Sequence, residues 1–170
     1  MRPSSAAFAL AFTLAAGASL TSARPAHAQS DDDRATARAL GMEGQQALDN
    51  KSYATAEDRF RRADKLIHAP TLELGLARAL AAEAKYVEAQ EAYNRIIREG
   101  LPPGAPEAFK HALEAAKQEV DGVAPKLGSV VITVKTSGGQ DIDSPKAALD
   151  GKPVNAASLG IKRAIDPGPH

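Results

Sequence analysis

The sequence predicts a mainly α-helical protein built from antiparallel helical hairpins, followed by a small all-β module. One observation is a spacing of 33 residues (44 to 77, 53 to 86) at which matching residues recur, and the other is a change to β-branched residues beyond Gly122. The recurring pairs are Gly44 with Ala77, Tyr53 with Tyr86, Ala56 with Ala89, Phe60 with Tyr93, Arg62 with Arg95, and Lys65 with Arg98. Such a period is typical of a solenoid, in which each hairpin buries its apolar face against its neighbours.

Residues 1–28 have the pattern of a cleavable signal peptide. Arg2 supplies a positive charge, an apolar stretch runs from Ala6 to Leu20, and Ala26-His27-Ala28 offers the small residues that signal peptidase requires. The alternative is an uncleaved membrane anchor, but this stretch spans only about 22 Å as a helix, short of the roughly 30 Å hydrocarbon core. We therefore expect a bacterial exported protein, periplasmic or associated with the cell envelope, with no transmembrane helix in its mature chain.

The composition excludes several classes of partner. The chain has 21 Lys and Arg residues against 21 Asp and Glu residues. Nothing in that balance favours nucleic acid or an anionic membrane surface. Cysteine is absent, so no disulfide can stabilise the exported protein, and its core must be stabilised by packing alone.

The helical region is expected to cover residues 35–122, after a flexible lead-in at 29–34. The acidic run ending at Asp33 suits a helix start better than a metal site, because negative residues are favoured at helix N-termini. Helices are expected over 35–48, from Tyr53 to about Ile67, over 71–82, from Tyr86 to about Gly100, and after Pro106 as a cap. The last of these repeats apolar residues at i, i+4, i+7 and i+11 and carries a polar outer face, as a terminal capping helix should.

The two hairpins resemble tetratricopeptide repeats. The resemblance rests on Gly44, Ala47, Tyr53, Ala56, Phe60 and Ala63 in one unit and on Ala77, Leu80, Tyr86, Ala89, Tyr93 and Ile96 in the next. It implies that small residues sit where helices cross and that an aromatic ring fills the space between hairpins. The expected packing residues are therefore Gly44, Ala56, Phe60, Ala77, Ala89 and Tyr93.

The same resemblance implies a binding surface on the inner face of the first helix of each hairpin. This face would hold Arg38, Gln45 and Asp49 in one unit, and Leu74 and Arg78 in the other. A groove of mixed polar and apolar character suits an extended peptide or a chain terminus. The alternative to a binding role is that each residue occupies an ordinary solvent-exposed helix position.

Beyond residue 128 the pattern predicts short strands. The expected strands are Ser129 to Lys135, Ala147 to Leu149, Lys152 to Val154, and Lys162 to Ile165. Asp150-Gly151 is a strong hairpin signal, because both residues tolerate positive φ.

The segment 128–170 resembles the PEGA module, a small β-sandwich-like domain of bacterial envelope and surface proteins. Asp150-Gly151-Lys152 and the motif from Pro167 to His170 carry the resemblance. In that family a further strand follows the second motif, so the module is expected to be truncated at His170 or completed by a partner.

The sequence shows no convergent catalytic set, so we expect no enzyme, no cofactor and no metal. The four histidines lack metal-ligand spacing among themselves. Asp141 and Asp143 suggest the start of a calcium loop, but Lys146 and Lys152 occupy the positions that need Gly and Glu.

The leading hypothesis is a non-enzymatic exported scaffold that binds a protein or peptide of the cell envelope, and a homo-oligomer is compatible with it. The alternative is a structural envelope component whose β module binds cell-wall polymer or a partner's β edge, with the helices as spacer. A third hypothesis is an accessory domain of a longer membrane protein.

Overall fold

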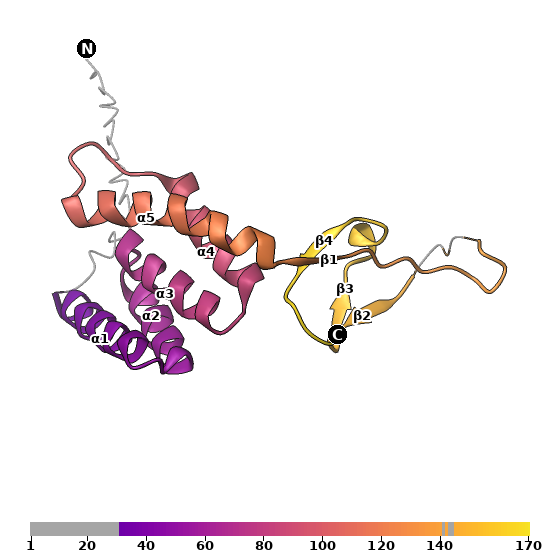
Figure 1. The fold of residues 1–170 in the computed structure, drawn as a ribbon, viewed down its shortest axis with the longest axis horizontal. Coiled ribbons are helices and arrows are strands. Elements are labelled where there is room, and N and C mark those ends of the chain that lie inside the picture. The colour runs from indigo at the N-terminus through magenta and orange to yellow at the C-terminus, as the bar shows by residue number, and fades with distance from the viewer. Residues whose placement is uncertain (1–30, 141, 143–144) are drawn as a thin grey trace, which may run out of the picture.

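A computed structural model describes residues 31–140, 142 and 145–170. The expected signal peptide and the acidic positions 141 and 143 lie outside the described residues. The described part of the chain is mainly helical, with four short strands at its C-terminal end (Figure 1). This confirms the expected fold class at the level of helices followed by a small β region.

The helices are α1 (Asp31–Asp49), α2 (Tyr53–Leu66), α3 (Pro70–Ala82), α4 (Tyr86–Glu99) and α5 (Glu107–Val123). A short 3₁₀ turn, η1 (Ala124–Lys126), leads into strands β1 (Gly128–Val130), β2 (Ala147–Leu149), β3 (Lys152–Val154) and β4 (Arg163–Ile165), and η2 (Ala156–Ser158) lies between β3 and β4. The first helix begins at Asp31, so residues 31–34, which were expected in a flexible lead-in, are helical. Three consecutive acids stabilise that helix start through the helix dipole.

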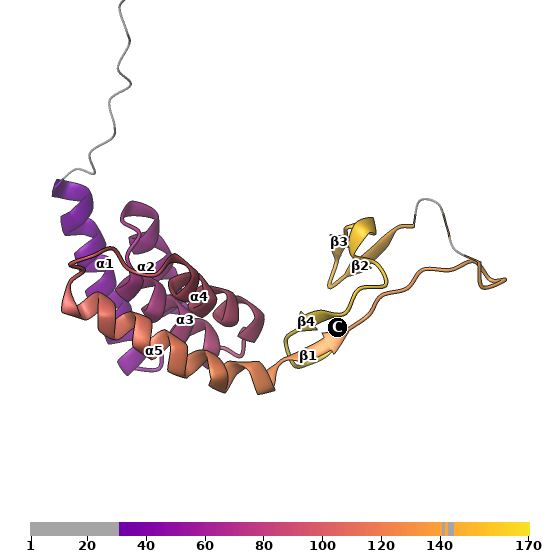
Figure 2. The same cartoon turned by 90° about the horizontal axis from the view of Figure 1, so that it is seen from above.

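Each helix packs against the next along the chain, from α1 through α5, which we name the helical stack. In addition, α3 contacts both α1 and α5, although neither is its neighbour along the chain. Figures 1 and 2 show α5 lying along the stack and the β region extending beyond the C-terminal end of that helix. Among the described ranges, no helix combines the length and the apolar composition that a membrane span requires.

The 33-residue period extends to the backbone of the turns within the two hairpins. Lys51 and Ala84 occupy the turns after α1 and α3, and both have positive φ, at 59° and 61°. The next residue, Ser52 or Lys85, donates its amide to a carbonyl of the preceding helix at 2.8 and 3.0 Å. Equivalent turns therefore reverse the chain in the same way in both hairpins.

The ring of Phe60 on α2 fills the space between α1 and α3 and touches glycines on both. A Cβ atom added to Gly44 would lie 3.0 Å from the ring, and one added to Gly75 would lie closer still. Phe60 itself is 3% exposed. Three helices therefore meet at one aromatic ring, and two of them lack a side chain at the contact.

Alanine dominates the rest of the core. Ala56, Ala77 and Ala89 are 0% exposed and Tyr93 is 2% exposed, so the expected packing residues are all buried in the stack. Small side chains let neighbouring helices approach closely, and larger residues such as Leu76, Leu80 and Ile96 fill the remaining space.

The strands form two antiparallel ladders of two strands each. Strand β1 pairs with β4, with Gly128 opposite Ile165, and β2 pairs with β3 as a hairpin. Asp150 and Gly151 turn that hairpin with φ of 52° and 73°, as their sequence predicts. None of the described residues from 124 to 170 is buried, so this region has no core of its own among them.

The strand predicted over 129–135 is wrong in its length. Strand β1 ends at Val130, because its only partner in the described chain, β4, spans three residues. Beyond it, the carbonyl of Ile132 accepts a single hydrogen bond from the amide of Gly160 at 2.8 Å. Only Ser129 and Val130 of the predicted segment belong to β1, because a ladder extends only as far as both strands.

The β region attaches to the helical stack at the N-terminus of α4. The carboxylate of Asp166 accepts a hydrogen bond from the amide of Val87 at 2.8 Å, while Lys85 at the N-cap position offers no side-chain cap. Nearby, the ammonium of Lys126 lies 5.1 Å from the centre of the Tyr86 ring. A residue far along the chain therefore satisfies an amide that has no partner within its own helix.

We expect Gly75→Ala to destabilise the protein by about 1–3 kcal/mol, because the new methyl overlaps the Phe60 ring. Gly122→Ala is the matched control: nothing lies near its added Cβ, so it should be neutral or stabilise α5 by up to about 1 kcal/mol. Chemical denaturation measures the free energy of unfolding of both variants. In a Phe60→Leu background the cost of Gly75→Ala should fall, and an unchanged cost would show that the ring is not the obstacle.

We expect Asp166→Ala to cost about 0.5–2 kcal/mol, the usual loss on removing a helix cap. Asp166→Asn keeps an oxygen acceptor and should lose only a fraction of that. Amide hydrogen exchange at Val87 reads the effect directly, with faster exchange in the alanine variant. Equal exchange in both variants would contradict the cap.

Candidate functional site

The structure separates the five residues that the sequence placed on one binding face. Gln45 and Asp49 are exposed on α1, where the amide of Gln45 donates to the carboxylate of Asp49 at 2.8 Å. Leu74 is 5% exposed and belongs to the core, so it cannot contact a ligand on the surface. The neighbouring positions Glu73 and Gly75 are buried as well, so this part of α3 offers no exposed face.

Arg78 is paired with Glu119 of α5, and its side chain stays 40% exposed. Its guanidinium donates to both carboxylate oxygens of Glu119, with the Nε atom at 3.1 and 3.0 Å and the Nη2 atom at 2.5 Å from Oε1. The hydroxyl of Tyr93 donates to the same carboxylate at 2.9 Å. This network joins α3, α4 and α5, so a substitution that reverses the charge at Arg78 would disturb the packing of α5.

The pKa of Glu119 follows from these contacts. Burial alone would raise the pKa of its carboxyl, but the hydrogen bonds from Arg78 and Tyr93, together with the charges of Arg78 and His111, lower it below its ordinary value. Burial also raises the pKa of the Tyr93 hydroxyl, which the bond to Glu119 reinforces. The carboxylate is therefore ionised and fully engaged in holding α5.

A pocket of about 360 Å³ lies where α1, α3 and α5 meet beside the α2–α3 connection, and we name it the α1–α3–α5 pocket. Its apolar lining is contributed by four different parts of the fold: Ala37, Ile67, Ala69, Leu72 and Phe109. Arg34, Arg38 and Thr71 complete it. The pocket thus combines apolar walls with two guanidinium groups.

Arg38 is the one residue of the predicted binding face that lies at this pocket. Arg34 pairs with Asp31 at 3.0 Å, but among the described residues no acceptor pairs with Arg38. A guanidinium next to an apolar wall can bind a carboxylate in bidentate geometry. The pocket therefore suits a ligand that presents an anionic group next to an apolar one.

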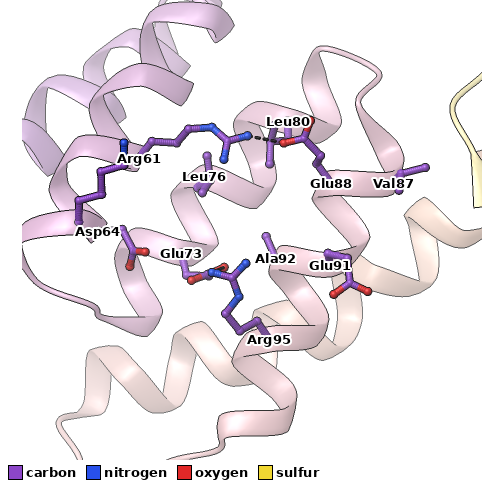
Figure 3. Close-up of a pocket in the computed structure, with 11 residues that line it drawn as sticks. Arg61, Asp64, Glu73, Leu76, Leu80, Val87, Glu88, Glu91, Ala92 and Arg95 are labelled. Carbon is purple, nitrogen blue, oxygen red and sulfur yellow. Dashed lines mark hydrogen bonds and ion pairs between the residues drawn. The ribbon is translucent and has the colours of Figure 1, made fainter. Parts of the chain in front are cut away.

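A second pocket, of about 330 Å³, lies on another side of the stack between α2, α3 and α4, and we name it the α2–α3–α4 pocket (Figure 3). Figure 3 shows the carboxylate of Glu73 on its floor beside the guanidinium of Arg95, with Asp64 close by. Glu73 is 0% exposed, and Arg95 Nη1 lies 3.3 Å from its Oε1 atom. Burial raises the pKa of Glu73, against the effect of Arg95.

Sequence reasoning missed most of the α1–α3–α5 pocket. The sequence predicts that Phe109 lies in the capping helix and Ile67 at the end of the helix that starts at Tyr53, but it places neither in a pocket. No local signal brings these two side chains together, because their positions depend on how α5 crosses the stack. The period of the repeats could place α1 against α3, but it does not extend to α5.

Comparison with protein-family models, with curated proteins and with solved structures finds no match to this chain.

The acid sensitivity of the fold should depend on Glu119. Because its pKa is lowered in the folded state, it stabilises the protein above its unfolded pKa, and this contribution is lost as the pH falls through the lowered value. Glu119→Gln should therefore lose less stability than the wild type on acidification from about pH 6 to about pH 3. Glu114→Gln, on the exposed face of α5, should keep the wild-type pH dependence. Identical profiles for all three proteins would contradict this role.

Proposed function

We propose that this protein is a non-enzymatic, exported scaffold that binds the C-terminal end of an envelope protein or peptide in the α1–α3–α5 pocket. The observation that carries the proposal is the combination of apolar walls with the guanidinium of Arg38, for which the described chain supplies no acceptor. A peptide terminus presents the complementary pair, an apolar side chain beside a carboxylate.

The repeat pattern supports this proposal. Equivalent backbone turns at Lys51 and Ala84, 33 positions apart, fit a tetratricopeptide-like solenoid, a kind of fold that presents its inner helices to extended ligands. In that proposal α5 is the terminal cap, and it also supplies Phe109 to the ligand pocket. The signal-peptide pattern of residues 1–28 supports export to the periplasm or the envelope.

A second candidate function rests on the β region. Strand β1 pairs with β4 alone in the described chain, so its other edge is unpaired there. Such an edge can accept a strand from a partner, as a structural envelope component with a PEGA-like module would require. Co-sedimentation with purified cell-wall polymer, unaffected by changes at Arg38, would favour this function over peptide binding.

The test of the leading proposal is a library of peptides that end in a free carboxyl group. We expect binders with an apolar last residue, and Arg38→Glu should weaken them at least tenfold in fluorescence anisotropy, while C-terminal amidation has a similar effect. Arg98→Glu, the same charge change on the exposed face of α4, is the matched control and should bind like the wild type. Peptides that bind equally well to both variants would overturn the proposal.

A further inference from the structure

Three side chains with metal-binding atoms converge at the junction of α2 and α3. Asp64 lies in the last turns of α2, His68 in the connection, and Glu73 in the first turn of α3. One donor atom from each lies within 4.8 Å of the other two. The Nδ1 atom of His68 is 2.8 Å from Oδ1 of Asp64 and 3.7 Å from Oε2 of Glu73.

The short connection between the helices creates this arrangement. Asp64 and His68 are four residues apart, which puts them on one side of the chain as α2 ends. Pro70 occupies the first turn of α3 and starts the new helix at once, so Glu73 returns toward the residues that close α2. The two carboxylates and the imidazole therefore come from two helices and the link between them.

Glu73 supplies an independent sign that this cluster accepts a ligand. Its side chain is 1% exposed, and within the described chain neither carboxylate oxygen has a hydrogen-bond donor. The guanidinium of Arg95 approaches at 3.3 Å without the alignment of a hydrogen bond. A buried carboxylate without hydrogen bonds is costly, and a cation bound directly at its oxygens would reduce that cost.

We propose that Asp64, His68 and Glu73 bind a divalent transition-metal ion of the zinc type at the α2–α3 junction. One imidazole nitrogen with two carboxylates is a ligand set that suits Zn²⁺. The two carboxylates also balance the charge of a divalent cation. Arg95, whose side chain is 47% exposed, can turn toward solvent when the ion occupies its place beside Glu73.

Glu99 supports the imidazole from its other side. The Nε2 atom of His68 lies 2.7 Å from the Oε2 atom of Glu99 on α4. In metal-binding histidines the N–H group of the second ring nitrogen commonly donates a hydrogen bond to a carboxylate, which holds the ring in position and directs the first nitrogen to the ion. The ion would therefore tie α2, α3 and α4 together. This proposal is independent of peptide binding in the α1–α3–α5 pocket.

Zn²⁺ titration of the whole, chelator-treated protein by calorimetry tests the site. We expect one ion per chain, and at least tenfold weaker binding in His68→Asn and in Glu73→Gln. Glu99→Gln should weaken binding about tenfold, as the loss of a supporting carboxylate does. His111→Asn changes an exposed histidine outside the cluster and is the matched control, which should bind like the wild type.

The readouts also distinguish a folding defect from a lost ligand. His68 lies in an exposed connection, so His68→Asn should keep the wild-type circular dichroism spectrum, and Zn²⁺ should raise the melting temperature of the wild type but not of this variant. No uptake of Zn²⁺ by the wild type would overturn the proposal. So would uptake that His68→Asn and Glu73→Gln leave unchanged, because it would assign the ion to other acidic residues.

Discussion

The fold depends on the close approach of three helices around the ring of Phe60. The ring needs space on both sides, and Gly44 on α1 and Gly75 on α3 supply it by having no side chain. Because the Phe60 ring of α2 lies against both α1 and α3, it positions the first helix of the second hairpin relative to the first hairpin. The alanine-rich core that continues through α3, α4 and α5 follows from the same short distances between helices.

Polar contacts between residues far apart in sequence then position α5 and the β region, which the packing around Phe60 does not fix. Arg78 and Glu119 lock α5 across α3, and Tyr93 joins α4 to the same carboxylate. Asp166 anchors the β region by capping α4 at Val87. The β region has no buried residue of its own among those described, so its position on the helical stack depends on contacts such as this cap and the approach of Lys126 to the Tyr86 ring.

The two proposed sites form in different ways within the same helical stack. The α1–α3–α5 pocket forms because α5 packs against α3 and α4 and contributes Phe109 to the lining that α1 completes with Arg38. The metal cluster forms because the chain passes from α2 to α3 in a short connection that carries His68 between Asp64 and Glu73. One site is set by long-range packing and the other by a local turn, although both lie next to the link between the hairpins.

The sequence by itself determined the elements with a local cause. Apolar spacing predicted the helices, the 33-residue period predicted equivalent hairpins, and Asp150-Gly151 predicted the strand turn, because each depends on residues that are neighbours in the chain. Tertiary structure alone decided that Leu74 is buried, that Arg78 pairs with Glu119 of α5, and that β1 stops at Val130. The physical reason is that a periodic pattern says which face of a helix is apolar, whereas the partner of each exposed side chain is chosen by contacts between segments far apart in sequence.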